Sequence, residues 1–141
     1  MRITLIGSVS FVKRMVGIYR QLESLGHEPL MLGHMFGLAD GTERKLMADI
    51  KRDHAWTKRE YDFFRRWHEL IKSGDAVLVC NFDKNGIRNY VGGNTLIEMG
   101  FAHVNGKKVF LLNPVPEGVG YSDEVRALAD VVLDGDLRKI G

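Results

Sequence analysis

The segment from Asp75 to Phe82, which reads DAVLVCNF, is an almost unbroken run of apolar, strand-forming residues. Such a run is typical of a central parallel strand, because that strand is covered by helices on both faces. A second run of this kind, Lys107 to Asn113 (KKVFLLN), follows after a gap long enough for a crossover helix. The two runs predict an α/β fold built around a parallel sheet.

Three shorter apolar segments, each bounded by turn residues, complete the predicted sheet. The five expected strands are Arg2 to Ile6, Glu28 to Leu32, Asp75 to Phe82, Lys107 to Asn113 and Val131 to Leu133. Strands that alternate with helices predict a three-layer, doubly wound sandwich with a five-stranded parallel sheet in the flavodoxin-like order 2-1-3-4-5. A chain of 141 residues suits a single domain, residues 1–141.

The segments between these strands have helical periodicity or capping residues. Apolar positions from Phe11 to Leu25 predict the first helix, and we interpret Gly33 to Gly41 as a loop. Thr42 is expected to cap a helix that continues toward Ala55, and the capping-box pattern TKRE, from Thr57 to Glu60, predicts a break near Trp56. The remaining predicted helices are Thr57 to Lys72, Thr95 to Val104 and Ser122 to Ala129, and Ser122 is expected to cap the last of them.

Composition excludes several classes of protein. Cys80 is the only cysteine, so we expect no disulfide, no cysteine-rich zinc site and a reducing cytoplasmic location; we interpret Cys80 as a residue packed in its strand. The apolar run at the N-terminus is too short to span a bilayer and lacks the pattern of a signal peptide, so no membrane partner is expected. The histidines show no spacing typical of a metal site, and we expect neither metal nor redox cofactor.

Basic pairs recur every seven residues in the predicted helical region, at Arg44-Lys45, Lys51-Arg52, Lys58-Arg59 and Arg65-Arg66. Two interpretations stay open. One is a solvated helix face mixed with acidic residues, and the other is a surface for nucleic acid assisted by Trp56 and Trp67. A formal net charge of +2 does not favour nucleic acid by itself.

The turn GSVSF, Gly7 to Phe11, joins the first strand to the first helix at the ligand-binding edge of such a sheet. Its backbone N–H groups and the hydroxyls of Ser8 and Ser10 are suited to an anion such as phosphate, although Ser10 could simply cap the helix. The turn matches neither GxGxxG nor the Walker sequence, so neither nicotinamide cofactors nor nucleoside-triphosphate hydrolysis is indicated.

The segment Asn81 to Ala102, NFDKNGIRNYVGGNTLIEMGFA, begins with a polar, glycine-rich stretch that is longer than a simple connection requires. This excess predicts a functional loop. Thr95 and Glu98 also fit a capping box, TLIE, so Glu98 could serve only to bind the backbone N–H of Thr95.

Four segments together resemble the nucleoside 2-deoxyribosyltransferase superfamily, which includes the 2′-deoxynucleoside 5′-phosphate N-hydrolases. They are GSVSF, DAVLVCNF, the glycine-rich entry to TLIEMGFA, and KKVFLLNP, and the resemblance that they carry covers most of the chain. The most specific element is Glu98-Met99-Gly100-Phe101-Ala102. The GGNTLIE stretch is less closely similar to the turn of the lonely-guy phosphoribohydrolases, which implies loss of a base from a nucleotide as well.

The resemblance implies cleavage or transfer at the N-glycosidic bond of a nucleoside or nucleoside 5′-monophosphate, with Glu98 as the nucleophile. A fixed carboxylate beneath C1′ can stabilise the positive sugar or form a glycosyl ester. We expect the helix dipole to hold Glu98 ionised in the first turn of its helix.

The group that protonates the departing base is not assigned, because the family's usual aspartate is replaced here by the stretch Arg66-Trp67-His68. His68, Asp83 and Asp62 are the candidates, and His68 could instead be structural. The candidates for substrate binding are the polar and glycine residues of the turns, namely Gly7, Ser8, Ser10, Phe11, Asn81, Asn89, Tyr90, Gly92, Gly93, Asn94 and Asn113, the last of which could instead form a turn.

Three functions are therefore compared: a glycosidic-bond enzyme, a non-catalytic nucleotide sensor, and a nucleic-acid-binding module. Hydrolase and transferase are not separated by sequence, and neither the sugar nor the base is fixed. The resemblance also implies a homodimer or larger assembly.

Overall fold

The chain folds around a five-stranded, all-parallel sheet in the order β2-β1-β3-β4-β5, as a computed structural model describes for residues 1–141. The predicted fold class and strand order are confirmed. The strands are β1 (Arg2–Ile6), β2 (Glu28–Leu30), β3 (Ala76–Val79), β4 (Lys108–Leu111) and β5 (Val131–Val132). Every residue of β3 is buried, which explains its unbroken apolar sequence.

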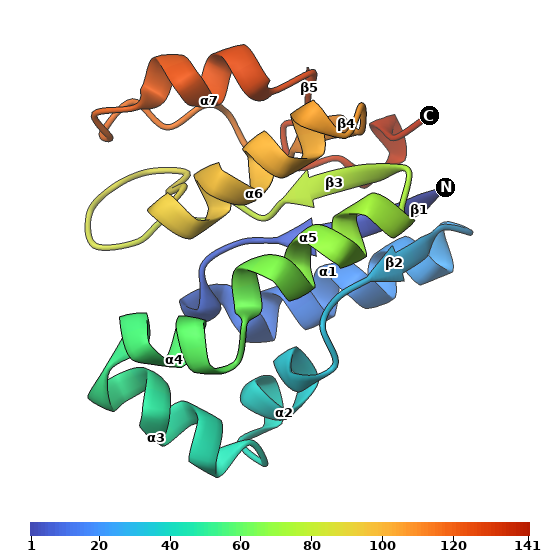
Figure 1. The fold of residues 1–141 in the computed structure, drawn as a ribbon. Helices are drawn as coiled ribbons and strands as arrows, with labels where there is room; N and C mark the ends of the chain where they lie inside the picture. The colour runs from blue at the N-terminus through green and yellow to red at the C-terminus, as the bar shows by residue number, and fades with distance from the viewer.

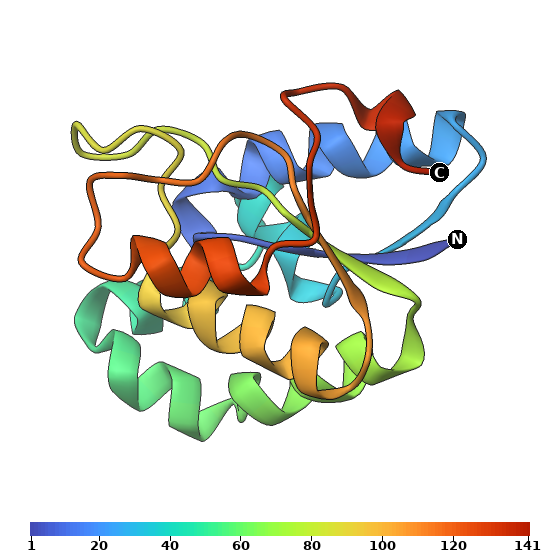
Figure 2. The ribbon, with the colours of Figure 1, turned by 90° about the horizontal axis from the view of Figure 1, so that it is seen from above.

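Helices cover both faces of the sheet (Figures 1 and 2). In Figure 2, α1 and the short C-terminal helix η2 lie on one face, and α5, α6 and α7 lie on the other. The helical elements are η1 (Val9–Phe11), α1 (Val12–Ser24), α2 (His34–Asp40), α3 (Arg44–Arg52), α4 (His54–Glu60), α5 (Phe63–Ser73), α6 (Gly93–Val104), α7 (Ser122–Leu128) and η2 (Leu137–Lys139). No helix is both long enough and apolar enough to cross a membrane.

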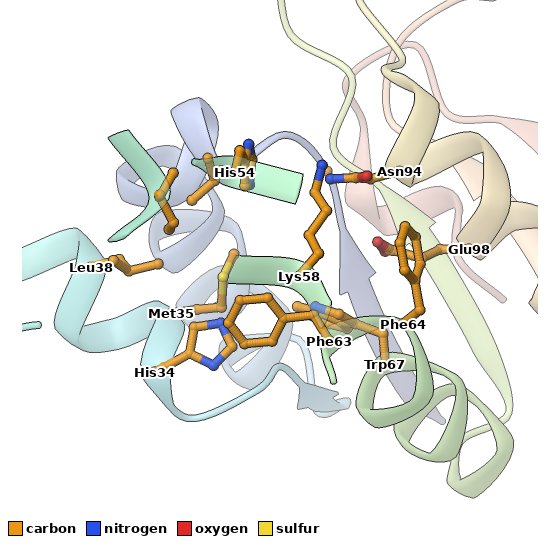
Figure 3. Close-up of a pocket in the computed structure, with 13 residues that line it drawn as sticks. His34, Met35, Leu38, His54, Lys58, Phe63, Phe64, Trp67, Asn94 and Glu98 are labelled. Carbon is orange, nitrogen blue, oxygen red and sulfur yellow. The ribbon is translucent and has the colours of Figure 1, made fainter. Parts of the chain in front are cut away.

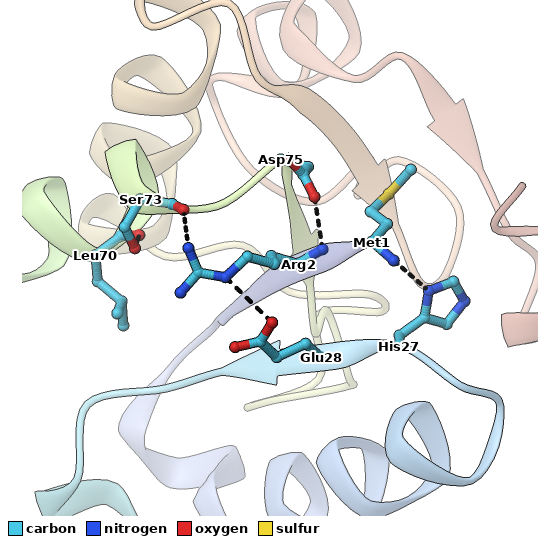
Figure 4. A network of polar contacts seen from close by, with 7 residues as sticks. All are labelled: Met1, Arg2, His27, Glu28, Leu70, Ser73 and Asp75. Carbon is cyan, nitrogen blue, oxygen red and sulfur yellow. Dashed lines mark hydrogen bonds and ion pairs between the residues drawn. The ribbon is translucent and has the colours of Figure 1, made fainter.

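The amino end of the sheet is held by polar contacts around Arg2 (Figure 4). The Arg2 backbone N–H donates to the Asp75 carboxylate at 2.7 Å, and its guanidinium donates to the carbonyl of Ser73 at 2.6 Å and pairs with Glu28 at 3.3 Å. These contacts join β1 to the segments that enter β2 and β3. They leave the opposite, carboxyl end of the sheet free to form a site.

The predicted loop from Gly33 to Gly41 is wrong, because it contains helix α2. The helix has only seven residues and no side-chain cap, so its local sequence signal is weak. Met35 and Leu38 hold it in place by entering the core, and Gly41 ends it with a left-handed φ of 83°. Tertiary contacts therefore make this segment helical.

The predicted capping box at Thr57 and Glu60 is also wrong. The chain breaks earlier, at Asp53, whose carboxylate accepts the backbone N–H of Trp56 at 2.9 Å and so caps α4. Thr57 lies within α4 and donates its hydroxyl to the Asp53 carbonyl at 2.8 Å. A second, unpredicted break occurs at Asp62, which has a left-handed φ of 53°.

Two further predicted caps differ in the structure. Thr42 is not the N-cap of α3, since that position belongs to Glu43, and the Thr42 hydroxyl donates to Asp40 instead. Ser122 is the first residue of α7, after an N-cap at Tyr121.

The basic pairs follow these breaks and fall on three separate helices, α3, α4 and α5 (Figure 1). They therefore do not form a stripe along one helix. Among the residues of these basic pairs, only Lys58 is partly buried, and its side chain lines a pocket.

Candidate active site

A pocket lies at the carboxyl end of the sheet, between the α2 to α5 region and the start of α6 (Figure 3). Its lining residues are Gly7, Val9, His34, Met35, Leu38, Ile50, His54, Lys58, Phe63, Phe64, Trp67, Asn94 and Glu98. The pocket has a volume of about 60 Å³. Sites for small organic ligands usually enclose about 300 to 1,000 Å³, so a nucleoside requires the walls to move apart.

Gly7 allows the first strand to approach this end of the sheet closely. A Cβ atom added at Gly7 would lie 3.1 Å from the Cys80 carbonyl oxygen and 3.2 Å from the Met15 sulfur. A larger residue would therefore push β1 away from β3 at the edge of the pocket. The glycine has a packing role here as well as a place in the lining.

Glu98 lies in the second turn of α6 and is 6% exposed. The capping box predicted for Thr95 and Glu98 is wrong, because the N-cap of α6 is Gly92 and Thr95 is the third helical residue. The carboxyl group of Glu98 faces the pocket (Figure 3). It is thus not used to cap its own helix.

The ionisation of Glu98 is set by burial. Burial raises its pKa from 4.5 to about 8, while the positive charge of Lys58 acts in the opposite direction. The expectation that the helix dipole holds this group ionised is wrong, since the dipole acts mainly within the first turn. At neutral pH the Glu98 carboxyl is mostly protonated in the free protein.

Lys58 approaches Glu98 from α4, across the pocket. Figure 3 shows the Lys58 ammonium beside the side chain of Asn94, with the Glu98 carboxyl in the same space. Burial lowers the pKa of Lys58, and Glu98 opposes this effect. Partial desolvation therefore disfavours the charged forms of Lys58 and Glu98. A ligand that supplies charge or polar contacts would change the pKa values of both groups.

Two histidines complete the polar lining. Burial and the nearby charge of Arg66 lower the pKa of His34 to about 4, its ring stacks on Phe63 at 4.6 Å, and its Nδ1 atom is buried without a hydrogen-bond partner. Burial also lowers the pKa of His54, and Lys58 and Lys84 add to the effect. Both rings are accordingly neutral at pH 7.

The serines of the first turn lie together beside a lysine. The hydroxyls of Ser8 and Ser10 are 2.8 Å apart, and Ser8 Oγ also accepts the backbone N–H of Ser10 and the ammonium of Lys84. Lys84 lies over the Tyr90 ring, 5.2 Å from its centroid. Ser8 rather than Ser10 is the helix cap, at the start of η1, and the adjacent cation suits the predicted anion site.

Asn81 and Asn113 bind each other and not the pocket. The Asn81 side chain donates to the carbonyls of Asn113 and Pro114 at 2.9 and 3.0 Å and accepts the Asn113 backbone N–H at 2.9 Å. Asn113 returns a side-chain bond to the Asn81 carbonyl at 3.1 Å. This pairing joins the ends of two neighbouring strands and gives both residues a structural role.

Asn81→Ala is expected to lower the free energy of unfolding by about 2 to 4 kcal/mol, because the buried Asn81 side chain makes three hydrogen bonds, to the Asn113 N–H and to the carbonyls of Asn113 and Pro114. Asn113→Ala removes only the side-chain bond and should cost about 1 kcal/mol. Urea unfolding of the two variants measures the difference. Equal decreases in the free energy of unfolding would contradict the structural role assigned to the Asn81 side chain.

The three candidates for the general acid lie outside this pocket. Asp83 accepts the backbone N–H of Asn89 within its own loop, and Asp62 pairs with Arg65 at 2.9 Å. His68 lies 2.9 Å from the Asn105 amide and packs against the Phe101 ring. None of them lines the space beside Glu98.

The remaining predicted binding residues are spread along the loops. Phe11 is in the core, where its ring meets Phe82 edge to face at 5.4 Å. Asn89, with a left-handed φ of 56°, lines a second, open cavity of about 470 Å³ between the β3–α6 and β4–α7 loops. Tyr90 packs on Gly92, which caps α6, and Gly93 is exposed at the start of that helix.

Sequence reasoning brought Gly7, Asn94 and Glu98 to the pocket and missed the opposite wall. His34, His54 and Lys58 belong to short helices, where the sequence predicts a loop from Gly33 to Gly41 and a helical region with a break near Trp56. No feature of the sequence distinguishes Lys58 from the other basic pairs, because its place in the pocket wall depends on contacts between residues distant in sequence.

No group of three or more His, Cys, Asp and Glu side chains is arranged to hold a metal ion. Comparisons with protein-family models, curated proteins and solved structures found no match to this chain. The pocket and the motifs that form it are therefore the features from which a function can be inferred.

Proposed function

We propose that this protein cleaves, or transfers, the base of a nucleoside or nucleoside 5′-monophosphate, with Glu98 as the nucleophile. One observation carries the proposal: a buried carboxyl group, free of hydrogen bonds to its own helix cap, faces a pocket at the carboxyl ends of the strands. Parallel sheets of this strand order bind ligands at this edge.

The reaction needs the ionised form of Glu98. A carboxylate oxygen attacks C1′ as the C1′–N bond breaks, and the bonding electrons leave with the base. Water, or a second base, then displaces the carboxylate from C1′. Lys58 is the only lysine or arginine that lines the pocket. Its ammonium stabilises the negative charge that develops on the departing base.

Substrate entry requires the α4 wall to move, because the enclosed space is only about 60 Å³. α4 is bounded by an extended residue at Asp53 and by the left-handed Asp62, so it can shift as a short unit between two bends. The cluster of Ser8, Ser10 and Lys84 beside the pocket favours a 5′-monophosphate over an uncharged nucleoside.

The direct test is chromatographic. The full chain is incubated with a panel of ribo- and deoxyribonucleosides and their 5′-monophosphates, and free base is measured with and without a second base as acceptor. Release of base from at least one compound supports the proposal. Binding without release across the panel would instead support a nucleotide sensor, an alternative favoured by the raised pKa of Glu98 and the narrow pocket.

The pH dependence of kcat/KM should show the ionisation of Glu98. Because Glu98 must lose its proton, kcat/KM should rise about tenfold per pH unit and level off near pH 8, where its pKa lies. Lys58→Met removes the charge that lowers this pKa, so the plateau should move to higher pH. The measurement is kcat/KM from pH 5 to 10 for both proteins, and a profile that falls above pH 8 in the native chain and in Lys58→Met alike would assign Glu98 the role of proton donor instead.

A further inference from the structure

His34, the first residue of α2, has a polar atom that the fold leaves without a partner. Its Nδ1 atom is buried and makes no hydrogen bond, although the side chain lines the pocket. The only other buried side-chain nitrogen or oxygen in this state is the hydroxyl of Thr4, which lies in β1 and does not line the pocket. Most buried polar atoms in native proteins are paired, because an unpaired one destabilises the fold. An unpaired atom in a pocket wall therefore suggests a partner that arrives with the ligand.

The ring of His34 is held in position and is uncharged. It stacks on Phe63, with the ring centroids 4.6 Å apart and an interplanar angle of 29°. Burial and the charge of Arg66 lower the pKa of His34 to about 4, so the ring is neutral at pH 7. A neutral imidazole has one N–H donor and one acceptor nitrogen. Because it has no charge to attract a phosphate, His34 is best suited to an uncharged polar group.

The wall between His34 and Glu98 is aromatic. Phe63, Phe64 and Trp67 line the pocket from α5. Figure 3 shows these three side chains between the His34 ring, on the α2 side, and the Glu98 carboxyl, on the α6 side. Aromatic side chains favour contact with another flat ring, and nucleobases stack on them regardless of sequence. A ligand whose reacting carbon lies at Glu98 would therefore extend a flat group along this wall toward His34.

We propose that His34 determines specificity by binding the edge of the substrate's base through a hydrogen bond at its Nδ1 atom. The inference rests on the proposed function, in which C1′ of the sugar lies at Glu98 and the base extends away from it. Every nucleobase has hydrogen-bond donors and acceptors on its edge, so either tautomer of a neutral His34 finds a partner there.

Binding of nucleotides tests this role separately from catalysis. The affinities are measured by calorimetry in Glu98→Gln, so that no base is released during the titration, with and without His34→Phe. Phenylalanine keeps a flat ring against Phe63 but has no polar atom. The substitution should raise the Kd of the best-bound nucleotide about tenfold, which is the usual effect of one hydrogen bond. The Kd of ribose 5-phosphate, which has no base, should stay the same.

A matched control and the contrary results complete this experiment. His103→Phe changes an exposed histidine at the end of α6 and should alter neither Kd. An unchanged Kd for the nucleotide in His34→Phe, or an equal loss for ribose 5-phosphate, would overturn the role of His34. If no nucleotide binds at all, both this role and the proposed function are wrong. If nucleotides bind with the expected dependence on His34 but the native chain releases no base, only the proposed reaction is wrong.

Thermal unfolding without ligand distinguishes a ligand-binding histidine from one that holds α2 in place. His34→Phe removes an unpaired buried atom and keeps the stacked ring, so the free protein should unfold at the same or a higher temperature. A lower unfolding temperature, together with weaker binding of nucleotide and ribose 5-phosphate alike, would assign His34 to the packing of α2 and overturn the inference.

Discussion

Glu98→Gln should lower the rate of base release by a factor on the order of 10³ or more, because it removes the only carboxylate in the pocket lining. Glutamine has nearly the same shape, so it should keep the place of Glu98 in the pocket wall that Trp67 and Phe64 also line. It cannot form a glycosyl ester as a carboxylate does. The expected loss therefore falls on kcat and leaves the binding of substrate largely in place.

The measurement compares kcat and KM of the native chain and Glu98→Gln on whichever compound of the panel is cleaved. Glu69→Gln is the matched control, since Glu69 lies on the exposed surface of α5 in a pair with Lys72. The control should retain full activity. A folded Glu98→Gln variant that releases base at the native rate would remove Glu98 from the mechanism.

The sheet and the position of Glu98 could be predicted because their signals are local. The apolar runs that became β3 and β4 are continuous in sequence, and the β3–α6 loop is conspicuous for its glycine and asparagine residues. Parallel strands then bring the turn at Gly7 and the start of α6 to one edge without further information. This is why Gly7, Asn94 and Glu98 were found.

The opposite wall of the pocket could not be predicted in the same way. Helices α2, α3 and α4 have seven to nine residues, and helices so short depend on tertiary contacts. One such contact joins the Tyr61 hydroxyl to Asp49 at 2.9 Å across the bends. Since Lys58 is carried by this region, its approach to Glu98 depends on contacts between residues distant in sequence.

The protonation of Glu98 was mispredicted for a related reason. A motif identifies a carboxylate, but its pKa depends on what surrounds it. Phe64 and Trp67, which line the same pocket as Glu98, come from α5, about thirty residues earlier. Burial then outweighs both the helix dipole and Lys58.

Glu98→Gln should also make the protein more stable at alkaline pH. In the unfolded chain Glu98 ionises near pH 4.5, whereas in the folded chain it holds its proton until about pH 8. Below pH 4.5 both states are protonated and the group costs nothing. Between the two values the folded state binds more protons than the unfolded state, so the free energy of unfolding decreases as pH rises.

The full effect is on the order of 5 kcal/mol and is complete above about pH 8. Urea unfolding of the native chain and Glu98→Gln from pH 4 to pH 9 measures it. The two proteins should have similar stability at pH 4, and the variant should be increasingly more stable toward pH 9. Glu69→Gln, whose carboxylate is exposed, should follow the native curve. Parallel curves for the native chain and Glu98→Gln would show that the pKa of Glu98 is ordinary.

The two expected effects of Glu98→Gln have opposite signs, and this opposition distinguishes a functional carboxylate from a structural one. A glutamate kept for stability would be paired or hydrogen-bonded, and its replacement would destabilise the fold at every pH. Glu98 instead costs stability wherever it is ionised, as groups at functional sites often do. If the same substitution abolishes base release and stabilises the fold above pH 8, the cost of burying this carboxyl group is explained by its chemistry.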